Sequence, residues 1–152
     1  MLTMTINGRR VSIDADPSES LAYVLRERLR LTGTKISCDV QVCGACTVLV
    51  DGLPVSSCTY LAYEARGREV LTVEGLAHTD GALDPLQRAF IEDNAFQCGY
   101  CTGGMLLAAH AYLADEQDGD SGENVFEALA GNICRCTGYV PIVAAVLRVR
   151  DG

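Results

Sequence analysis

The alternation of apolar and polar side chains predicts two β-hairpins in the first half of the chain. Residues 2–14 alternate around Asn7-Gly8, a pair that favours a tight type I′ turn between two strands. A second hairpin is expected where the apolar stretch 47–50 meets Asp51-Gly52, with a return strand over residues 53–57. The first half of the chain is therefore expected to contain a sheet.

A helix is expected between these hairpins. Asp16-Pro17-Ser18-Glu19 is typical of a helix start, with Asp16 as the N-cap and the proline in the first turn, and Gly33 is the expected stop. Between them, apolar residues recur at helical spacing: Leu21, Val24, Leu25 and Leu29. A further strand at 69–73 would complete a small β-rich unit with one helix packed across it.

The pattern becomes helical in the second half of the chain. Four helices are expected there: 84–94, 102–114, one that opens at 120–123 and ends before Gly131, and one that follows Cys136 with Pro141 in its first turn. A polar, glycine-containing stretch separates the two patterns. The chain is thus predicted to be α+β, with a β-rich domain at residues 1–76, a linker at 77–82 and a helical domain at 83–152.

Eight cysteines fall into two sets of four. The first set, spaced C-x4-C-x2-C-x11-C, contains Cys38, Cys43, Cys46 and Cys58. The second set has a C-x2-C pair and a distant C-x-C pair, and contains Cys98, Cys101, Cys134 and Cys136. The first spacing is typical of plant-type [2Fe–2S] sites. No cysteine is left over, so the simplest interpretation is two four-thiolate sites that hold two [2Fe–2S] clusters.

Other uses of these cysteines are also conceivable. The spacing of the second set, taken alone, does not separate iron–sulfur from zinc. A disulfide framework is disfavoured, because the N-terminus lacks the basic segment of a signal peptide. Four thiolates close the coordination sphere of a cluster, and closed clusters usually move electrons rather than bind substrate. No catalytic residue is therefore expected in this chain.

Charge and hydropathy narrow the classes of partner. The net charge of −8 argues against nucleic acid. No apolar run approaches the ~20 residues that span a bilayer, so we expect a cytoplasmic protein with no membrane span. Because clusters add further negative charge, their loops should offer backbone N–H donors, and Gly44 and Ala45 leave room for such bonds.

With these motifs in place, the chain resembles the small iron–sulfur subunit of the molybdenum hydroxylases. This family includes xanthine dehydrogenase, aldehyde oxidoreductase and aerobic carbon monoxide dehydrogenase. The resemblance spans nearly the whole chain and is carried by six motifs in order: Leu31-Thr32-Gly33-Thr34-Lys35, Cys43-Gly44-Ala45-Cys46-Thr47-Val48, Ser57-Cys58, Thr72-Val73-Glu74-Gly75-Leu76, Gln97-Cys98-Gly99-Tyr100-Cys101-Thr102 and Gly131-Asn132-Ile133-Cys134-Arg135-Cys136-Thr137-Gly138-Tyr139.

The resemblance implies both a fold and partners. The fold would be a β-grasp, plant-ferredoxin-like domain followed by a four-helix bundle with two-fold pseudosymmetry. The partners would be a large subunit with a molybdopterin cytosine dinucleotide and a medium subunit with FAD, assembled as a dimer of heterotrimers. The substrate of the complex would be an N-heterocycle, carbon monoxide or an aldehyde.

The resemblance also implies roles for individual residues. Electrons would enter the cluster of the second cysteine set, pass to the cluster of the first set and continue to FAD. Gln97 would hydrogen-bond the pterin cofactor, and Cys136 would lie against it. One departure is Gly103, because relatives usually have proline there; this puts the rigidity of the helix start in doubt, but not ligation.

Two other functions are weighed against this one. A freestanding two-cluster ferredoxin would use the first domain equally well, but the sparse charge between Phe96 and Ala114 suits a permanent interface better. An iron–sulfur redox sensor would need a basic surface for nucleic acid, which the acidic composition disfavours.

Overall fold

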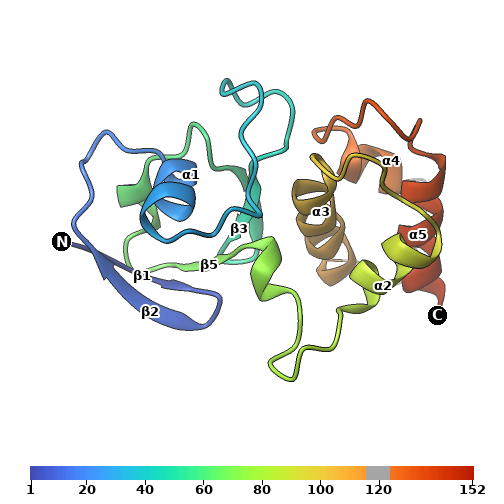
Figure 1. Ribbon diagram of the computed structural model, residues 1–152, viewed down its shortest axis with the longest axis horizontal. Helices are drawn as coiled ribbons and strands as arrows, with labels where there is room; N and C mark the ends of the chain where they lie inside the picture. The colour runs from blue at the N-terminus through green and yellow to red at the C-terminus, as the bar shows by residue number, and fades with distance from the viewer. Residues whose placement is uncertain (116–123) are drawn as a thin grey trace.

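A computed structural model describes residues 1–115 and 124–152. The chain forms two lobes side by side, a sheet-containing lobe at the N-terminus and a helical lobe at the C-terminus (Figure 1). The strands of the first lobe are β1 (Leu2–Ile6), β2 (Arg9–Ile13), β3 (Thr47–Val50), β4 (Leu53–Ser56) and β5 (Glu69–Leu71). Its helical segments are α1 (Leu21–Tyr23), the π-helical η1 (Val24–Arg28), and the 3-10 turns η2 (Ala62–Ala65) and η3 (Val73–Gly75). The second lobe contains α2 (Pro85–Glu92), α3 (Thr102–Ala114), α4 (Asn124–Leu129) and α5 (Val140–Asp151).

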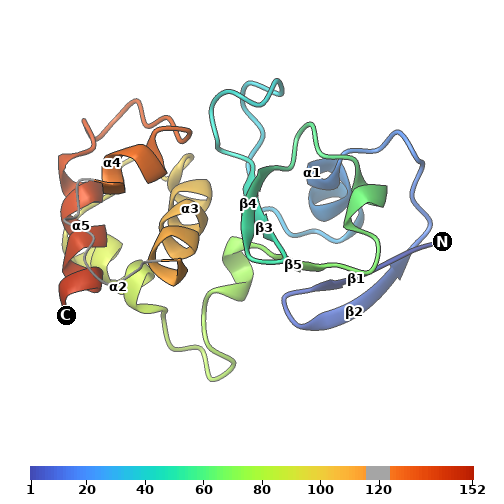
Figure 2. The ribbon, with the colours of Figure 1, turned by 180° about the vertical axis from the view of Figure 1, so that it is seen from behind.

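The five strands form one mixed sheet in the order β2-β1-β5-β3-β4. β1 runs parallel to β5, and the other neighbours are antiparallel. Both predicted type I′ turns are confirmed, because Asn7, Gly8, Asp51 and Gly52 all have positive φ. The α1–η1 segment crosses one face of the sheet (Figure 2), and its apolar side chains join those of the strands in one core. The β-rich unit with a helix across it is therefore confirmed.

The helix that crosses the sheet begins later than the sequence predicts. Asp16 accepts hydrogen bonds from the backbone N–H (2.8 Å) and the hydroxyl (2.6 Å) of Ser18, so its carboxylate closes a local turn and does not cap a helix. Ser20 is the N-cap, and its Oγ accepts from the N–H of Tyr23 at 3.3 Å. Ser20 is held extended by a β-bridge to Leu61, a partner distant in sequence. The expectation that Asp16 is the N-cap was therefore wrong.

The same helix also ends before the predicted stop at Gly33. Its last turn is π-helical, and Leu29 is its C-cap. Arg30 then adopts a positive φ of 61°, which reverses the chain without glycine. A tertiary hydrogen bond explains what Gly33 does instead: its N–H donates to the carboxylate of Glu74 at 2.7 Å. The predicted strand at 69–73 is likewise shorter, because the 3-10 turn η3 begins at Val73.

The helical lobe is a bundle whose contacts come in matched pairs. α2 packs on α5 and α3 packs on α4, while α2 also contacts α3 and α4 contacts α5. Exchanging the first two helices with the last two leaves this pattern unchanged, as two-fold pseudosymmetry requires. α2 begins at Pro85 with Asp84 as its N-cap, α3 begins at Thr102, and α5 begins at Val140 with Pro141 in its first turn, so these predicted starts are confirmed. The predicted opening of the third helix at 120–123 lies outside the described residues.

α3 is the element that joins the two lobes. It packs on β3 and β4 as well as on α2 and α4, and residues 104–109 are all buried. Gly104 permits the closest approach, since a Cβ there would lie 2.2 Å from the carbonyl oxygen of Gly44 in the other lobe. Across residues 1–115 and 124–152, no helix combines the length and apolar character that a membrane crossing needs.

Candidate metal centres

The sheet lobe brings the first cysteine set together on the side that faces the helical lobe. Cys38 and Cys43 lie in the loop between η1 and β3, and Cys46 immediately precedes β3. Cys58 follows β4, so the β3–β4 hairpin places it beside Cys46. Cys46 and Cys58 are buried and pack together with Ala22, whereas the other two thiols are partly exposed. All four predicted residues therefore lie around one loop.

Backbone N–H groups surround the sulfur of Cys38. The N–H groups of Val40, Val42 and Cys43 approach its Sγ at 3.5, 3.3 and 3.3 Å. These bonds, that from Val40 first, lower the pKa of Cys38 to about 6, so they favour the thiolate.

Two unusual backbone conformations create this N–H cradle. Asp39 and Gln41 have φ values of 57° and 61°, and both side chains are exposed. Alternating left-handed residues turn successive N–H groups to the same side of the chain, which forms an anion-binding concavity.

Burial has the opposite effect on Cys46. Desolvation raises the pKa of this thiol to about 11, and the neighbouring Cys58 thiol adds to the effect. A thiol in such surroundings ionises readily only when a nearby cation compensates its charge, and a metal ion supplies that compensation. The first set therefore combines a stabilised thiolate at Cys38 with a buried thiol at Cys46 whose ionisation a metal would favour.

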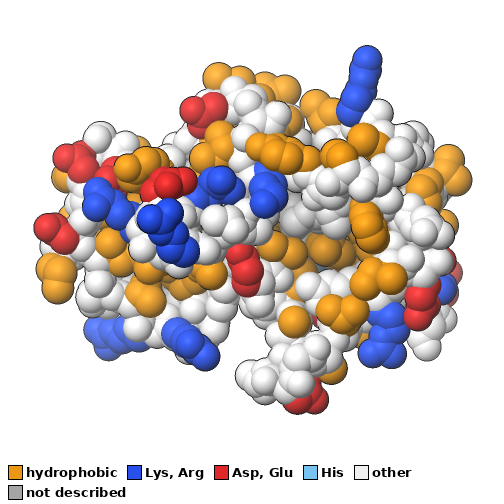
Figure 3. All heavy atoms as spheres, in the orientation of Figure 1, with side chains coloured by type: hydrophobic (Ala, Val, Ile, Leu, Met, Phe, Trp, Pro, Cys, Tyr) orange, Lys and Arg blue, Asp and Glu red, His pale blue; other side chains and the backbone are white. Residues whose placement is uncertain are grey.

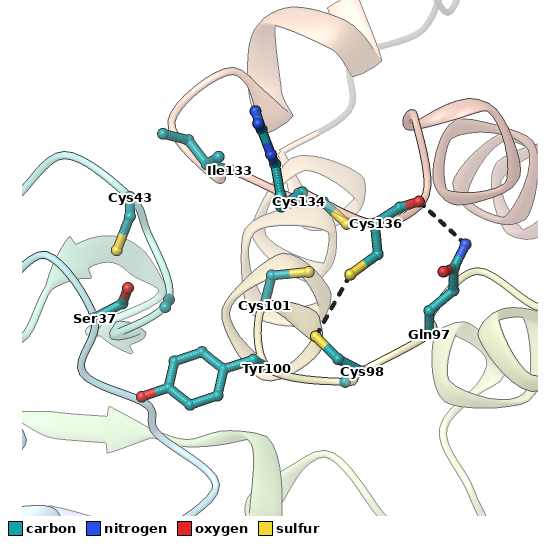
Figure 4. A pocket seen from close by; sticks show the side chains of 12 residues that line it. Ser37, Cys43, Gln97, Cys98, Tyr100, Cys101, Ile133, Cys134 and Cys136 are labelled. Atoms are coloured by element: carbon teal, nitrogen blue, oxygen red, sulfur yellow. Dashed lines mark hydrogen bonds between the residues drawn. The ribbon is translucent and has the colours of Figure 1, made fainter.

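The helical lobe brings the second cysteine set together from two helix starts. Cys101 is the N-cap of α3, and Cys98 lies in the turn before it. Cys134 and Cys136 lie in the loop between α4 and α5. Figure 4 shows the four thiol groups pointing toward one another in a cavity of about 200 Å³. The structure thus joins residues that are far apart in the sequence.

Cys101 and Cys134, the two less exposed thiols of this set, lie in different electrostatic surroundings. Burial, followed by the contact with Cys134, raises the pKa of Cys101 to about 12. Burial also opposes ionisation of Cys134, but hydrogen bonds from the hydroxyl and N–H of Thr137 outweigh it and lower the pKa of Cys134. Cys98 and Cys136 are exposed at the mouth of the cavity.

Gln97 lies at the same mouth. Its side-chain Nε2 donates to the backbone carbonyl of Cys136 at 3.1 Å (Figure 4). Both residues are exposed, so a molecule at the cavity mouth could reach them. The family resemblance implies that both residues meet the pterin cofactor, and here they are hydrogen-bonded to each other. Their contact with a pterin stays a prediction.

Direct hydrogen bonds tie the two cysteine sets together. The N–H of Ile133, next to Cys134, donates to the carbonyl of Cys43 at 2.8 Å. The hydroxyl of Tyr100 donates to the carbonyl of Ile36 at 2.5 Å, so a residue of the second set's loop reaches the first set's loop (Figure 4). The two candidate centres are therefore contiguous.

Asn132 is a part of this junction that sequence reasoning missed. It is 5% exposed, and its Nδ2 donates to the carbonyl of Gly44 at 3.0 Å and approaches the hydroxyl of Thr47 at 3.2 Å. A buried amide is stable only when it is hydrogen-bonded, and these partners come from the other lobe. The one sequence signal was a polar residue beside a cysteine motif, which does not reveal a partner about ninety positions away.

The sulfur geometry of the second set is compatible with a binuclear cluster. In the part of the chain that the structure describes, no three His, Cys, Asp or Glu side chains converge closely enough for one metal ion. However, the Sγ atoms of Cys98 and Cys136 are 3.7 Å apart. This is close to the ~3.8 Å between two sulfurs on one tetrahedral metal with metal–sulfur bonds of about 2.3 Å. Four thiols arranged in pairs around a cavity thus fit a [2Fe–2S] cluster, in which each iron takes two protein sulfurs.

Comparison with protein families supports this fit for both lobes. Residues 4–74 match the family described as "2Fe-2S iron-sulfur cluster binding domain". Residues 72–147 match the family described as "[2Fe-2S] binding domain", and this match decides between iron–sulfur and zinc for the second set.

Individual relatives cover almost the whole chain. The nicotine 6-hydroxylase small subunit of Paenarthrobacter nicotinovorans is 49% identical over 96% of this chain and 87% of its own length. The nicotinate dehydrogenase small FeS subunit of Eubacterium barkeri is 44% identical over 95% of this chain and 91% of its own length. In the crystal structure of quinoline 2-oxidoreductase from Pseudomonas putida 86, one chain superposes with a TM-score of 0.90 and 46% identity, covering 95% of this chain and 88% of that chain. The chain therefore belongs to the family of small [2Fe–2S] iron–sulfur subunits of the molybdenum hydroxylases.

Proposed function

We propose that this chain carries electrons within a molybdenum hydroxylase, from a large molybdopterin-binding subunit to FAD in a medium subunit. The observation that carries the proposal is the contact between the two cysteine loops, made by the Ile133–Cys43 and Tyr100–Ile36 hydrogen bonds. A chain that holds two redox centres in touching loops can pass an electron through its own interior. Relatives described as subunits of larger enzymes favour this function over a freestanding ferredoxin.

The eight thiols are proposed as the only ligands of the two centres. Cys38, Cys43, Cys46 and Cys58 would hold one cluster, and Cys98, Cys101, Cys134 and Cys136 the other. The sulfur distance between Cys98 and Cys136 supports their sharing one iron, which leaves Cys101 and Cys134 for the second iron. When bound, a [2Fe–2S] cluster supplies one-electron transfer without an open coordination position. We accordingly propose no catalytic residue in this chain.

The surface around the second set supports its assignment to the large subunit. Tyr100 and Ile133 are exposed and line the cavity that holds Cys98 and Cys136, and the exposed side chains of Phe96 and Val140 lie two and four residues from these cysteines along the chain. Figure 3 shows more Lys and Arg side chains over the sheet lobe than over the upper front of the helical lobe, where one such side chain projects from a surface that is otherwise largely apolar or uncharged. An apolar patch around a functional opening is typical of a permanent interface. We propose that Gln97 and Cys136 meet the pterin cofactor there.

The loop of the first set has a similar but smaller apolar tip. Val40 and Val42 are 64% and 61% exposed beside the sulfur of Cys38. We propose that this tip faces the FAD subunit, so that the first set is the exit for electrons. We also propose that two such heterotrimers form a dimer and that the complex is cytoplasmic. The linker between the two domains is proposed to be residues 77–82. The substrate, which the large subunit selects, would be an N-heterocycle, carbon monoxide or an aldehyde.

Electron paramagnetic resonance of the native complex tests this function. After reduction with dithionite, the complex should show two distinct signals of reduced [2Fe–2S] clusters. Cys101→Ser should perturb one signal and Cys43→Ser the other. Ser37→Ala is the matched control, because Ser37 lines the same cavity without being a proposed ligand, and it should leave both signals intact. The proposal fails if either cysteine variant removes both signals equally, or if the native chain purifies alone without a pterin-bearing subunit.

A further inference from the structure

A closed circuit of hydrogen bonds surrounds Cys134. The backbone N–H of Cys134 donates to the hydroxyl oxygen of Tyr139 at 2.9 Å, and that hydroxyl donates in turn to the carbonyl of Asn132 at 3.1 Å. The backbone N–H of Tyr139 donates to the Oγ1 of Thr137 at 3.2 Å. The Oγ1 of Thr137 lies 3.1 Å from the Sγ of Cys134.

This circuit fixes the direction of the Thr137 hydroxyl proton. A hydroxyl has one proton and two acceptor lone pairs, and the Tyr139 N–H occupies one lone pair. The sulfur of a thiolate is an acceptor with no proton of its own, so the Thr137 proton points to Cys134. Tyr139 is held in place by its left-handed backbone (φ 68°) and by the two bonds of its own hydroxyl, so the N–H that orients Thr137 is fixed.

Cys134 also accepts from the backbone N–H groups of Thr137 and Cys136, so the Thr137 hydroxyl is distinctive because it is a side-chain donor. In the first set, Cys38 accepts from the backbone N–H groups of Val40, Val42 and Cys43, which side-chain substitution does not remove. The donor from Thr137 is a side chain, partly buried and directed at a single sulfur. A hydrogen bond to a ligand sulfur stabilises the added negative charge of the reduced cluster more than the oxidised form, and so raises its reduction potential.

We propose that the Thr137 hydroxyl raises the reduction potential of the centre held by the second cysteine set. The inference rests on the proposed function, since it assumes that these thiols hold a cluster. Thr137 acts through Cys134 and is a positioning residue. Its hydroxyl would keep the centre that receives electrons from the large subunit easy to reduce.

A redox titration of the intact complex, followed by electron paramagnetic resonance, tests this role. Thr137→Val keeps the shape of the side chain but removes the hydroxyl. The equilibrium constant for reducing one centre should then fall by about tenfold, a shift of about 59 mV for a one-electron couple. Thr137→Ser keeps the hydroxyl and should stay near the original potential. The centre of the first set should not move in either variant.

The outcomes separate this inference from the proposed function. If the native complex gives two cluster signals but Thr137→Val and Thr137→Ser have equal potentials, the inference fails and the proposed function stands. A shift of both centres would also overturn it, because the effect would then not act through Cys134. Thr137→Ala is a second variant without the hydroxyl, to be measured if Thr137→Val binds too little iron. If Val and Ala both lose iron while Ser retains it, the hydroxyl serves assembly instead and the tuning role is wrong.

Discussion

Gly44 lies where the two cysteine loops touch. It lies between Cys43 and Ala45 with φ +70°, and a Cβ there would lie 2.4 Å from the carbonyl oxygen of Gly131. Its own carbonyl accepts the hydrogen bond from Asn132. The position therefore demands glycine for two reasons, the positive φ and the lack of space.

These two reasons can be separated by a matched pair of substitutions. Gly67 has a nearly equal φ of +73° but nothing within 4 Å of a Cβ. Gly67→Ala should cost about 1 kcal/mol of unfolding free energy from backbone strain alone. Gly44→Ala should cost at least about 2 kcal/mol more, because backbone atoms of the other lobe must move. Denaturant unfolding of both variants measures the difference, and equal losses would show that the lobes do not touch at Gly44.

The Tyr100 hydroxyl makes a second residue-scale prediction. Tyr100→Phe removes only the hydrogen bond to Ile36 and should lower the unfolding free energy by about 0.5–1.5 kcal/mol. Tyr23→Phe is the control, since Tyr23 is 44% exposed and no hydrogen bond to its hydroxyl is found in the described residues. Thermal unfolding compares the two variants. An effect no larger than that of the control would contradict the Tyr100–Ile36 contact.

At the scale of elements, the helix across the sheet shows where local signals mislead. Asp16-Pro17-Ser18-Glu19 has every mark of a helix start, but the Asp16 carboxylate is satisfied within its own turn. The helix starts at Leu21, whose N–H donates to the carbonyl of Tyr60 at 2.7 Å. That partner is set by the tertiary fold, so the local pattern, which offers both Asp16 and Ser20 as capping residues, does not decide between them.

Comparing two capping residues tests the observed start of this helix. Ser20→Ala removes the Oγ that accepts from Tyr23 and should cost about 1 kcal/mol of unfolding free energy. Asp16→Ala, which removes the sequence-predicted cap, should have the smaller effect of a surface turn residue. Urea unfolding measures both variants. A larger loss for Asp16→Ala would restore Asp16 as the cap and contradict the structure.

The hairpins of the first lobe and the helices of the second lobe were more predictable from the sequence. Asn7-Gly8 and Asp51-Gly52 specify their turns locally, because type I′ geometry needs positive φ at both central residues. α2 starts at the predicted place because Asp84 and Gln87 form a capping box across its first turn. Each of these signals lies within a few residues of the feature that it specifies.

For the whole molecule, the sequence identifies the two cysteine sets but not how they meet. The spacing of Cys38, Cys43 and Cys46 on one loop is local and so is visible in the sequence. The junction between the lobes depends on Gly44, Gly104 and Asn132, which follow no periodic pattern and meet partners far along the chain. Contacts of this kind come from packing the two lobes together, and only the structure shows them.

The junction connects two surfaces that we propose as the entry and the exit for electrons. The second set opens at an apolar surface, the first set lies beneath an exposed loop tip, and the two loops are hydrogen-bonded between these openings. An electron entering at one opening and leaving at the other would remain inside a single polypeptide. This arrangement explains why a family of electron-transfer subunits keeps both lobes in one chain.

The central claim is that the eight thiols of this chain hold two binuclear iron–sulfur centres. Measuring iron and acid-labile sulfide in the native complex tests it most directly. The account predicts about four irons and about four sulfides for each copy of the chain, with no zinc at these sites. A yield of about two irons and two sulfides for each copy of the chain, or zinc bound at the second cysteine set, would contradict it.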